Sequence, residues 1–107
     1  MSSFTLHDLE KRVQERAQAS ADISYTRKLI DRGINHCAKK FGEEAVEAAI
    51  AAVAEDRDRM IEETADVLYH LLVMLHARGI SLAEVEAALA ERMRRSGLEE
   101  KAARKGG

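Results

Sequence analysis

The chain contains no proline in its 107 residues, and eighteen of those residues are alanine. Proline interrupts a helix more strongly than any other residue, whereas alanine has the highest helix propensity. Leucine, glutamate, lysine and arginine, which also favour helix, make up much of the remaining sequence. The sequence therefore predicts helix almost throughout, and an all-α fold.

Local signals indicate where these helices begin and end. Thr5 with Asp8, and Ser81 with Glu84, have the spacing of a capping box, in which two side chains bond each other's backbone N–H groups. Gly33 is expected to stop a short helix, because glycine readily adopts the conformation that closes a helical turn. We expect four to five helices, over residues 5 to about 20, 25–32, 34–54, 57–78 and 81–94.

The helix expected over residues 57–78 is apolar on two sides. At 100° per residue, one apolar stripe is formed by Ile61, Ala65, Leu68, Leu72 and Leu75, and the opposite side carries Val67, Val73 and Met74. A helix that is apolar nearly all round is buried nearly all round, and one small chain cannot cover both faces. We therefore expect an antiparallel helical bundle that is completed by homodimerisation.

The charged residues are unevenly distributed along the chain. Lys and Arg exceed Asp and Glu by three in residues 1–42 and by four in residues 92–107, whereas residues 43–91 carry a balance of −9. Binding to nucleic acid needs an extended basic face, so no nucleic-acid partner is expected. The pattern suits a ligand with a metal ion and phosphates, although ordinary solvated helix faces would give the same composition.

Composition also limits the compartment and the domain count. No stretch approaches the roughly 20 apolar residues that cross a membrane, and the first ten residues do not have the pattern of a signal peptide. The single cysteine, Cys37, excludes an internal disulfide and a cysteine-built zinc site. We expect one cytoplasmic domain over residues 1–107, with residues 96–107 as a polar tail.

Two pairs of carboxylates are the main chemical signal. Glu44 and Glu47 lie three residues apart on one expected helix, and Glu63 and Asp66 repeat that spacing on the next. Residues three apart share a helix face, and the short connection at residues 55–56 makes the two helices antiparallel neighbours. The four carboxylates are therefore expected to meet on one seam between the helices.

Carboxylates gathered on such a seam would repel one another. Folding would then raise their pKa values or recruit a cation, and a site of oxygen ligands alone selects Mg²⁺ or Mn²⁺ above zinc. Glu43 lies at the edge of the same face. The alternative is that all of these residues are ordinary glutamates and aspartates of a helix surface.

Other residues near this seam have less specific patterns. Lys39 and Lys40 precede the acidic run by one turn and could contact phosphate oxygens, while pairing of Lys40 with Glu44 along the helix is a compatible alternative. His70 is expected in the core or at its boundary, and His36 is given a structural role. No glycine-rich phosphate loop and no HExxH motif occurs in the sequence.

The run EEAVE at residues 43–47, followed by ETAD at residues 63–66, resembles the EExxE…ExxD signature of the all-α, MazG-type nucleotide pyrophosphohydrolases. The similarity is closer still to the phosphoribosyl-ATP pyrophosphohydrolase family, whose members catalyse the second step of histidine biosynthesis. It rests on SYTRKLIDRG (24–33), AKKFGEEAVEAAIAA (38–52), DRDRMIEETADVLYHLLVMLHARGISLAEV (56–85) and SGLEEKAAR (96–104).

The resemblance implies Mg²⁺-dependent hydrolysis of phosphoribosyl-ATP to phosphoribosyl-AMP and pyrophosphate. Carried onto this chain, Glu44, Glu47, Glu63 and Asp66 would hold the ion, with Mn²⁺ as a substitute. Glu43 would be a further ligand or the base that orients the attacking water, and Glu47 is also counted as catalytic.

The phosphoribosyl group of this substrate would need further cationic contacts. The candidates are Arg27, Lys28, Arg32, Lys39 and Lys40 before the acidic centre, and Arg94, Arg95, Lys101 and Arg104 after it. The tail is expected to fold over the bound substrate. The sequence departs from the family pattern at His36 and Cys37, which weakens a phosphate role for position 36.

Two alternatives belong to other functional classes. One is a house-cleaning nucleoside triphosphate pyrophosphohydrolase that uses the same helices on another substrate. The other is a helical dimerisation module without enzymatic activity, in which the acidic seam is structural. Burial of four carboxylates without a ligand would be unfavourable, which argues against the module.

Overall fold

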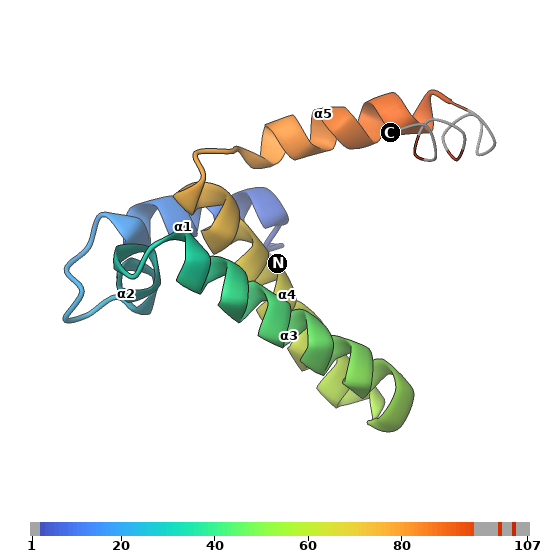
Figure 1. The fold of residues 1–107 in the computed structure, drawn as a ribbon, viewed down its shortest axis with the longest axis horizontal. Helices are drawn as coiled ribbons and strands as arrows, with labels where there is room; N and C mark the ends of the chain where they lie inside the picture. Colours follow the sequence, from blue (N-terminus) through green and yellow to red (C-terminus); the bar gives the residue numbers. More distant parts are fainter. Residues whose placement is uncertain (1–2, 96–100, 102–103, 105–107) are drawn as a thin grey trace.

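The computed structural model describes residues 3–95, together with Lys101 and Arg104. The elements of this part of the chain are all helical: α1 (Leu6–Ala17), α2 (Tyr25–Asp31), α3 (Ile34–Ala54), α4 (Arg57–Ala77) and α5 (Leu82–Met93) (Figure 1). The all-α prediction is confirmed, and α3 runs through Gly42 without a break. No helix among the described residues is long and apolar enough to cross a membrane.

The helix ends follow the predicted capping signals. The Thr5 hydroxyl accepts a hydrogen bond from the backbone N–H of Asp8, whose carboxylate accepts one from Thr5 in return. Ser81 and Glu84 form the same capping box at the start of α5. Gly33 joins α2 to α3 with a φ of 95°, a left-handed conformation that glycine adopts without strain.

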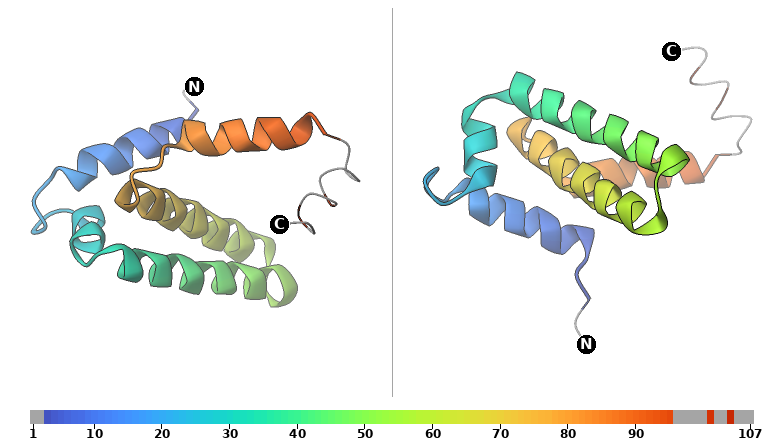
Figure 2. Two further views of the ribbon diagram at one scale, coloured as in Figure 1. Left: turned by 45° about the horizontal axis from the view of Figure 1, so that its top comes forward. Right: turned by 90° about the horizontal axis from the view of Figure 1, so that it is seen from below.

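The antiparallel pair of α3 and α4 is the largest contact in the fold, and α1 and α2 pack against one end of it (Figures 1 and 2). The core lies at this end and consists of Val13, Leu29, Cys37, Leu72, Val73 and Leu82. The other end of the pair, which includes the loop between α3 and α4, extends beyond α1 and α2. The packed end therefore fixes the helices while the extended end leaves their surfaces accessible.

Helix α5 is attached to the rest of the fold by its first turns. The backbone N–H of Leu82 donates to the Glu10 carboxylate over 2.7 Å, and His7 Nε2 lies 3.0 Å from Glu86 Oε1 and Oε2. Beyond these contacts α5 stands apart from α3 and α4, and its Met93 is 73% exposed (Figure 2). The apolar side of α5 has little cover within one chain.

A buried hydrogen bond connects α2 to α4. The Tyr69 hydroxyl lies 2.5 Å from Thr26 Oγ1, and Thr26 is buried. Burial raises the pKa of Tyr69, so its phenol stays neutral and available for this bond. The contact fixes α2 against α4 at Tyr69, the residue immediately before His70.

Replacement of Tyr69 by phenylalanine should destabilise the fold, because it leaves the buried Thr26 hydroxyl without its partner. We expect the free energy of unfolding to fall by about 1–2 kcal/mol in urea denaturation. Tyr25→Phe is the matched control, because no hydrogen bond of the exposed Tyr25 hydroxyl occurs in the described structure. Equal stabilities of the two variants would contradict a stabilising role for the Tyr69–Thr26 bond.

Candidate metal centre and active site

Three carboxylates meet across the seam between α3 and α4. Glu44, Glu63 and Asp66 each present an oxygen, and these oxygens all lie within 4.8 Å of one another. Glu63 and Asp66 are on one face of α4 because they are three residues apart, and the antiparallel pairing places Glu44 of α3 opposite them. Glu47 lines the same groove as Glu44 and its charge acts on the Glu44 carboxyl, but it is not one of the three clustered ligands.

The electrostatics of this cluster favour a cation. Burial raises the pKa of Glu44, and the hydrogen bond with Glu47 and the negative charges of Glu47 and Asp66 raise it further. A raised carboxyl pKa means that the surroundings disfavour the ionised form. A divalent cation in the cluster would reverse this effect, because its charge stabilises every neighbouring carboxylate.

Glu63 provides the clearest sign of a missing partner. Its side chain is 8% exposed, and Oε1 accepts a bond from the Arg59 guanidinium over 2.5 Å. Its second oxygen, Oε2, is buried without any hydrogen-bond partner. An unpartnered buried carboxylate oxygen is unfavourable, and here it belongs to the carboxylate that meets Glu44 and Asp66. The residues therefore fit a hard divalent cation, Mg²⁺ or Mn²⁺, with only oxygen ligands.

An open groove of about 780 Å³ lies beside the cluster on α3. Its lining includes Lys40, Glu43, Glu44 and Glu47. Lys40 Nζ lies 3.5 Å from Glu43 Oε1, so its ion pair is with Glu43 and not with Glu44, the partner suggested by the four-residue spacing. The pKa of Lys40 is raised, first by the nearby Tyr25 phenol, so the side chain stays a cation at the rim of the groove.

His70 is a buried neighbour of the carboxylate cluster. Its Nε2 lies 3.9 Å from Glu44 Oε1, too far for a hydrogen bond, and its ring packs edge-on against Tyr69 and Tyr25. Burial, and then the charge of Lys40, lower the pKa of His70. His70 is buried, as the expectation of a core or boundary position allowed, and a neutral ring adds no charge to the acidic cluster.

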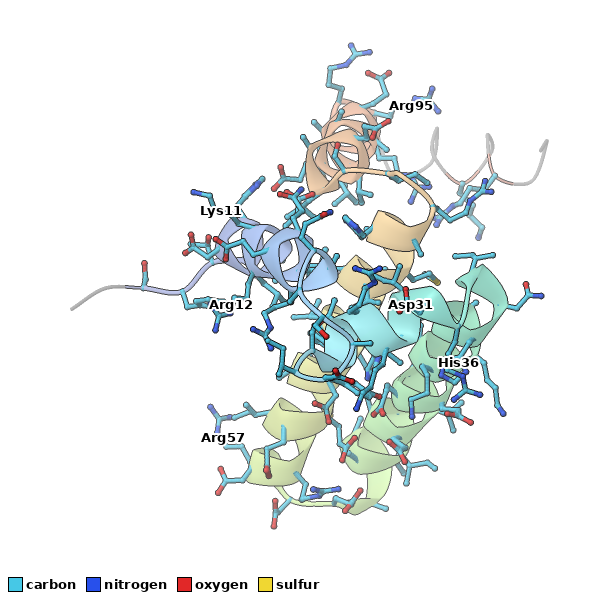
Figure 3. All side chains as sticks on the ribbon, turned by 90° about the vertical axis from the view of Figure 1, so that its left-hand side faces the viewer. Lys11, Arg12, Asp31, His36, Arg57 and Arg95 are labelled. Atoms are coloured by element: carbon cyan, nitrogen blue, oxygen red, sulfur yellow. The ribbon has the colours of Figure 1, made fainter. Side chains whose placement is uncertain are left out.

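The structure also separates some predicted site residues from the cluster. Lys39 is exposed and does not line the groove. Arg94 is bonded to Glu91 near the end of α5, and Arg95 lies at that same end, apart from α3 (Figure 3). Lys101 is exposed, but the rest of the tail at residues 96–107, apart from Arg104, lies outside the described residues. The expected closure of the tail over substrate therefore stays a prediction.

Sequence reasoning missed two residues beside the cluster. Arg59 bonds Glu63 across one helical turn. Their four-residue spacing on one helix could have predicted this ion pair. Tyr25 packs against His70 although it belongs to α2, and no spacing in the sequence indicates this contact.

Together, these features define an all-α protein with a cluster of carboxylates that could bind a metal ion on two antiparallel helices, next to an open groove. A family model described as "Phosphoribosyl-ATP pyrophosphohydrolase" matches residues 6–93. The chain belongs to this family, as its sequence motifs suggested.

Named relatives match over nearly their whole length. The chain is 63% identical to "Phosphoribosyl-ATP pyrophosphatase 1" of Rhodopseudomonas palustris, with 98% of each chain covered. It is 63% identical to the protein of the same name from Bradyrhizobium diazoefficiens, with 98% of this chain and 99% of the relative covered. The "Phosphoribosyl-ATP pyrophosphatase" of Rhizobium meliloti is 51% identical, with 97% of each chain covered.

Replacement of Glu44 by glutamine should separate metal binding from folding. In the absence of metal, we expect the melting temperature to stay the same or rise, because one charge leaves a cluster of like charges. Saturating Mg²⁺ or Mn²⁺ should raise the melting temperature of the unmodified protein by several degrees and that of the variant far less.

The control for this measurement is Glu62→Gln, which removes one exposed carboxylate from α4 outside the cluster. It should keep the metal-induced rise. A large fall in the metal-free melting temperature of Glu44→Gln would instead make Glu44 a structural residue.

Proposed function

We propose that the chain hydrolyses the α–β phosphoanhydride of phosphoribosyl-ATP, giving phosphoribosyl-AMP and pyrophosphate in the second step of histidine biosynthesis. Family membership supports this reaction. The observation that carries the metal dependence is the buried, unpartnered Glu63 Oε2 within the carboxylate cluster. We further propose that the enzyme works in the cytoplasm.

The three clustered carboxylates, Glu44, Glu63 and Asp66, together with the neighbouring Glu47, are proposed to hold Mg²⁺, with Mn²⁺ as a substitute. When bound, the ion supplies positive charge that stabilises the phosphates and the pyrophosphate leaving group. Arg59 positions Glu63 by bonding Oε1, which leaves Oε2 as the oxygen available for a ligand bond. The chain therefore fixes the most buried ligand before any substrate binds.

Hydrolysis also needs a group that accepts a proton from the attacking water. We assign this role to Glu43, whose carboxylate lines the groove but does not belong to the three-oxygen cluster. The new bond forms between the water oxygen and the α-phosphorus, and the bond from that phosphorus to the bridging oxygen breaks. Glu47 also lines the groove. We propose that it both binds the ion and takes part in catalysis.

Lysine and arginine side chains are proposed to bind the substrate phosphates. Lys40 is supported by its place in the groove beside Glu43 and Glu44. Lys39, Arg94, Arg95 and Lys101 stay predictions. Because α5 stands apart from α3 within one chain, we propose that Arg94 and Arg95, which follow α5, bind substrate phosphates in the groove of a second copy of the chain (Figure 2).

Glu47→Gln and Asp66→Asn should each abolish most of the metal-dependent turnover without unfolding the protein. We expect kcat for phosphoribosyl-ATP to fall at least about 100-fold, because each variant removes charge that holds the ion. Pyrophosphate release measures the rate, and circular dichroism checks the helices. Glu62→Gln, which removes an exposed charge from the same helix as Asp66, should retain turnover.

Two outcomes of this assay would contradict the proposal in different ways. Loss of helicity in both variants would make the carboxylates structural, as in a dimerisation module. Faster hydrolysis of ordinary nucleoside triphosphates than of phosphoribosyl-ATP by the unmodified chain would indicate a house-cleaning pyrophosphohydrolase.

We also propose a homodimer as the working form. Large apolar side chains of α3 are exposed in a single chain, with Val46, Ile50 and Val53 at 60%, 53% and 90% exposure. The radius of gyration is 16.1 Å, against about 13 Å for a compact domain of this length. An extended chain with uncovered apolar helix faces gains stability when a second copy covers them.

Sedimentation at micromolar concentration should therefore give a particle of twice the 11.9 kDa chain mass. Ile50→Asp should shift the equilibrium toward the monomer, because it places a charge on the exposed apolar face of α3. Ile23→Asp is the matched control in the loop between α1 and α2, where the side chain is 69% exposed. A monodisperse monomer of the unmodified chain would refute the homodimer.

A further inference from the structure

A second hollow lies between α2 and α3, next to the metal centre. It has a volume of about 470 Å³, which is in the range of about 300–1,000 Å³ found for small-molecule sites. Tyr25 and Leu29 form an apolar part of its lining, and the cationic or basic side chains are Lys28, Arg32, His36 and Lys40. We call this hollow the α2–α3 pocket.

The α2–α3 pocket carries excess positive charge. Asp31 is the acidic residue of its lining, and that carboxylate is already bonded to Arg27 over 2.8 Å. Within the described part of the chain, neither Lys28 nor Arg32 forms an ion pair. The pKa of His36 is lowered by burial and then by the charges of Arg32 and nearby lysines, as expected in a positive field.

Helix geometry makes this arrangement unfavourable without an anion. Lys28 and Arg32 are four residues apart, and like charges at this spacing repel. His36 lies four residues before Lys40, and its lowered pKa keeps the ring uncharged beside that lysine. The first turn of α3 contains no acidic residue, although the positive end of a helix dipole favours one. His36 lies in that turn, so the local sequence adds basic groups where the backbone already provides positive potential.

The α2–α3 pocket adjoins the groove beside the carboxylates. Lys40 lines both this pocket and the groove beside the carboxylates. The Tyr25 ring of the pocket lies 6.3 Å from the His70 ring, and His70 is 3.9 Å from Glu44. A ligand whose phosphates occupy the groove can therefore place a further anionic group in the α2–α3 pocket.

We propose that the α2–α3 pocket binds the 5-phosphate of the substrate's phosphoribosyl group, with Lys28, Arg32 and His36 as phosphate contacts and Tyr25 against the sugar. This inference rests on the proposed function. Pyrophosphate has no apolar part, whereas a sugar phosphate matches a pocket with both an apolar wall and cations. Because ordinary nucleoside triphosphates lack this phosphate, the pocket determines specificity.

The test is a binding experiment that needs no turnover. Ribose 5-phosphate is titrated into the full-length ¹⁵N-labelled protein without metal, and backbone amide shifts are followed in residues 25–40. We expect saturable shifts there, and a Kd about 10-fold or more higher in Arg32→Gln and in Lys28→Gln, because each loses a charged phosphate contact. Arg12→Gln removes a cation from α1, apart from His36, and should leave the Kd unchanged (Figure 3).

A kinetic measurement completes the test. Arg32→Gln should raise KM for phosphoribosyl-ATP about 10-fold while kcat changes little, because the residue binds a remote part of the substrate. Binding of ribose 5-phosphate without hydrolysis of phosphoribosyl-ATP would refute the proposed function and retain the sugar-phosphate site.

Three results would overturn the inference itself. Ribose 5-phosphate could fail to shift residues 25–40, or Arg32→Gln and Arg12→Gln could weaken its binding equally. Pyrophosphate could also shift these residues as strongly as ribose 5-phosphate, which would assign the α2–α3 pocket to the leaving group. Each result can occur while phosphoribosyl-ATP is still hydrolysed, so failure of the pocket is distinguishable from failure of the proposed function.

Discussion

Repulsion among the carboxylates on the seam between α3 and α4 is the constraint on which the arrangement of the molecule depends. Glu44 has a raised pKa and Glu63 keeps an unpartnered oxygen, so this part of the seam does not stabilise the helix pair by itself. Stability must come from the opposite end, where α1 and α2 pack against α4 around Val13 and Val73. The core therefore holds the two helices in place, while the carboxylates outside it repel one another. This arrangement is expected when a bound ligand supplies the positive charge that the carboxylates need.

The two hollows beside α3 have opposite electrostatic character, and this difference explains how one small chain can orient a large anionic substrate. The groove carries the carboxylates and accepts phosphate only together with a cation. The α2–α3 pocket carries basic groups and can accept a phosphate directly. Lys40 lies where they meet and is held by Glu43, so it can contact substrate without neutralising the metal ligands. A ligand reversed in this site would lose both interactions.

Sequence reasoning succeeded where the determining interactions are local. The caps at Thr5 and Ser81 involve residues three apart, and the carboxylate pairs require only helix periodicity and a short connection, so both were predictable. The α2–α3 pocket was not, because it depends on the angle that the Gly33 turn sets between two helices. For the same reason His36 was given a structural role and Tyr25 was overlooked, although both line that pocket. The position of α5 depends on the Glu10–Leu82 contact, which spans 72 residues.

The uncovered apolar surface and the active-site groove are adjacent on α3. Val46 lines the groove and is 60% exposed, and Ile50 lies one turn further along the same helix. A second copy that covers these side chains would therefore also form a wall of the groove and exclude water from the carboxylates. Lower water content strengthens every charge interaction in the site, including those of the metal ligands with a cation. The proposed dimer thus follows from the same feature as the proposed chemistry: one chain supplies the charged groups of the site but leaves them on an open surface.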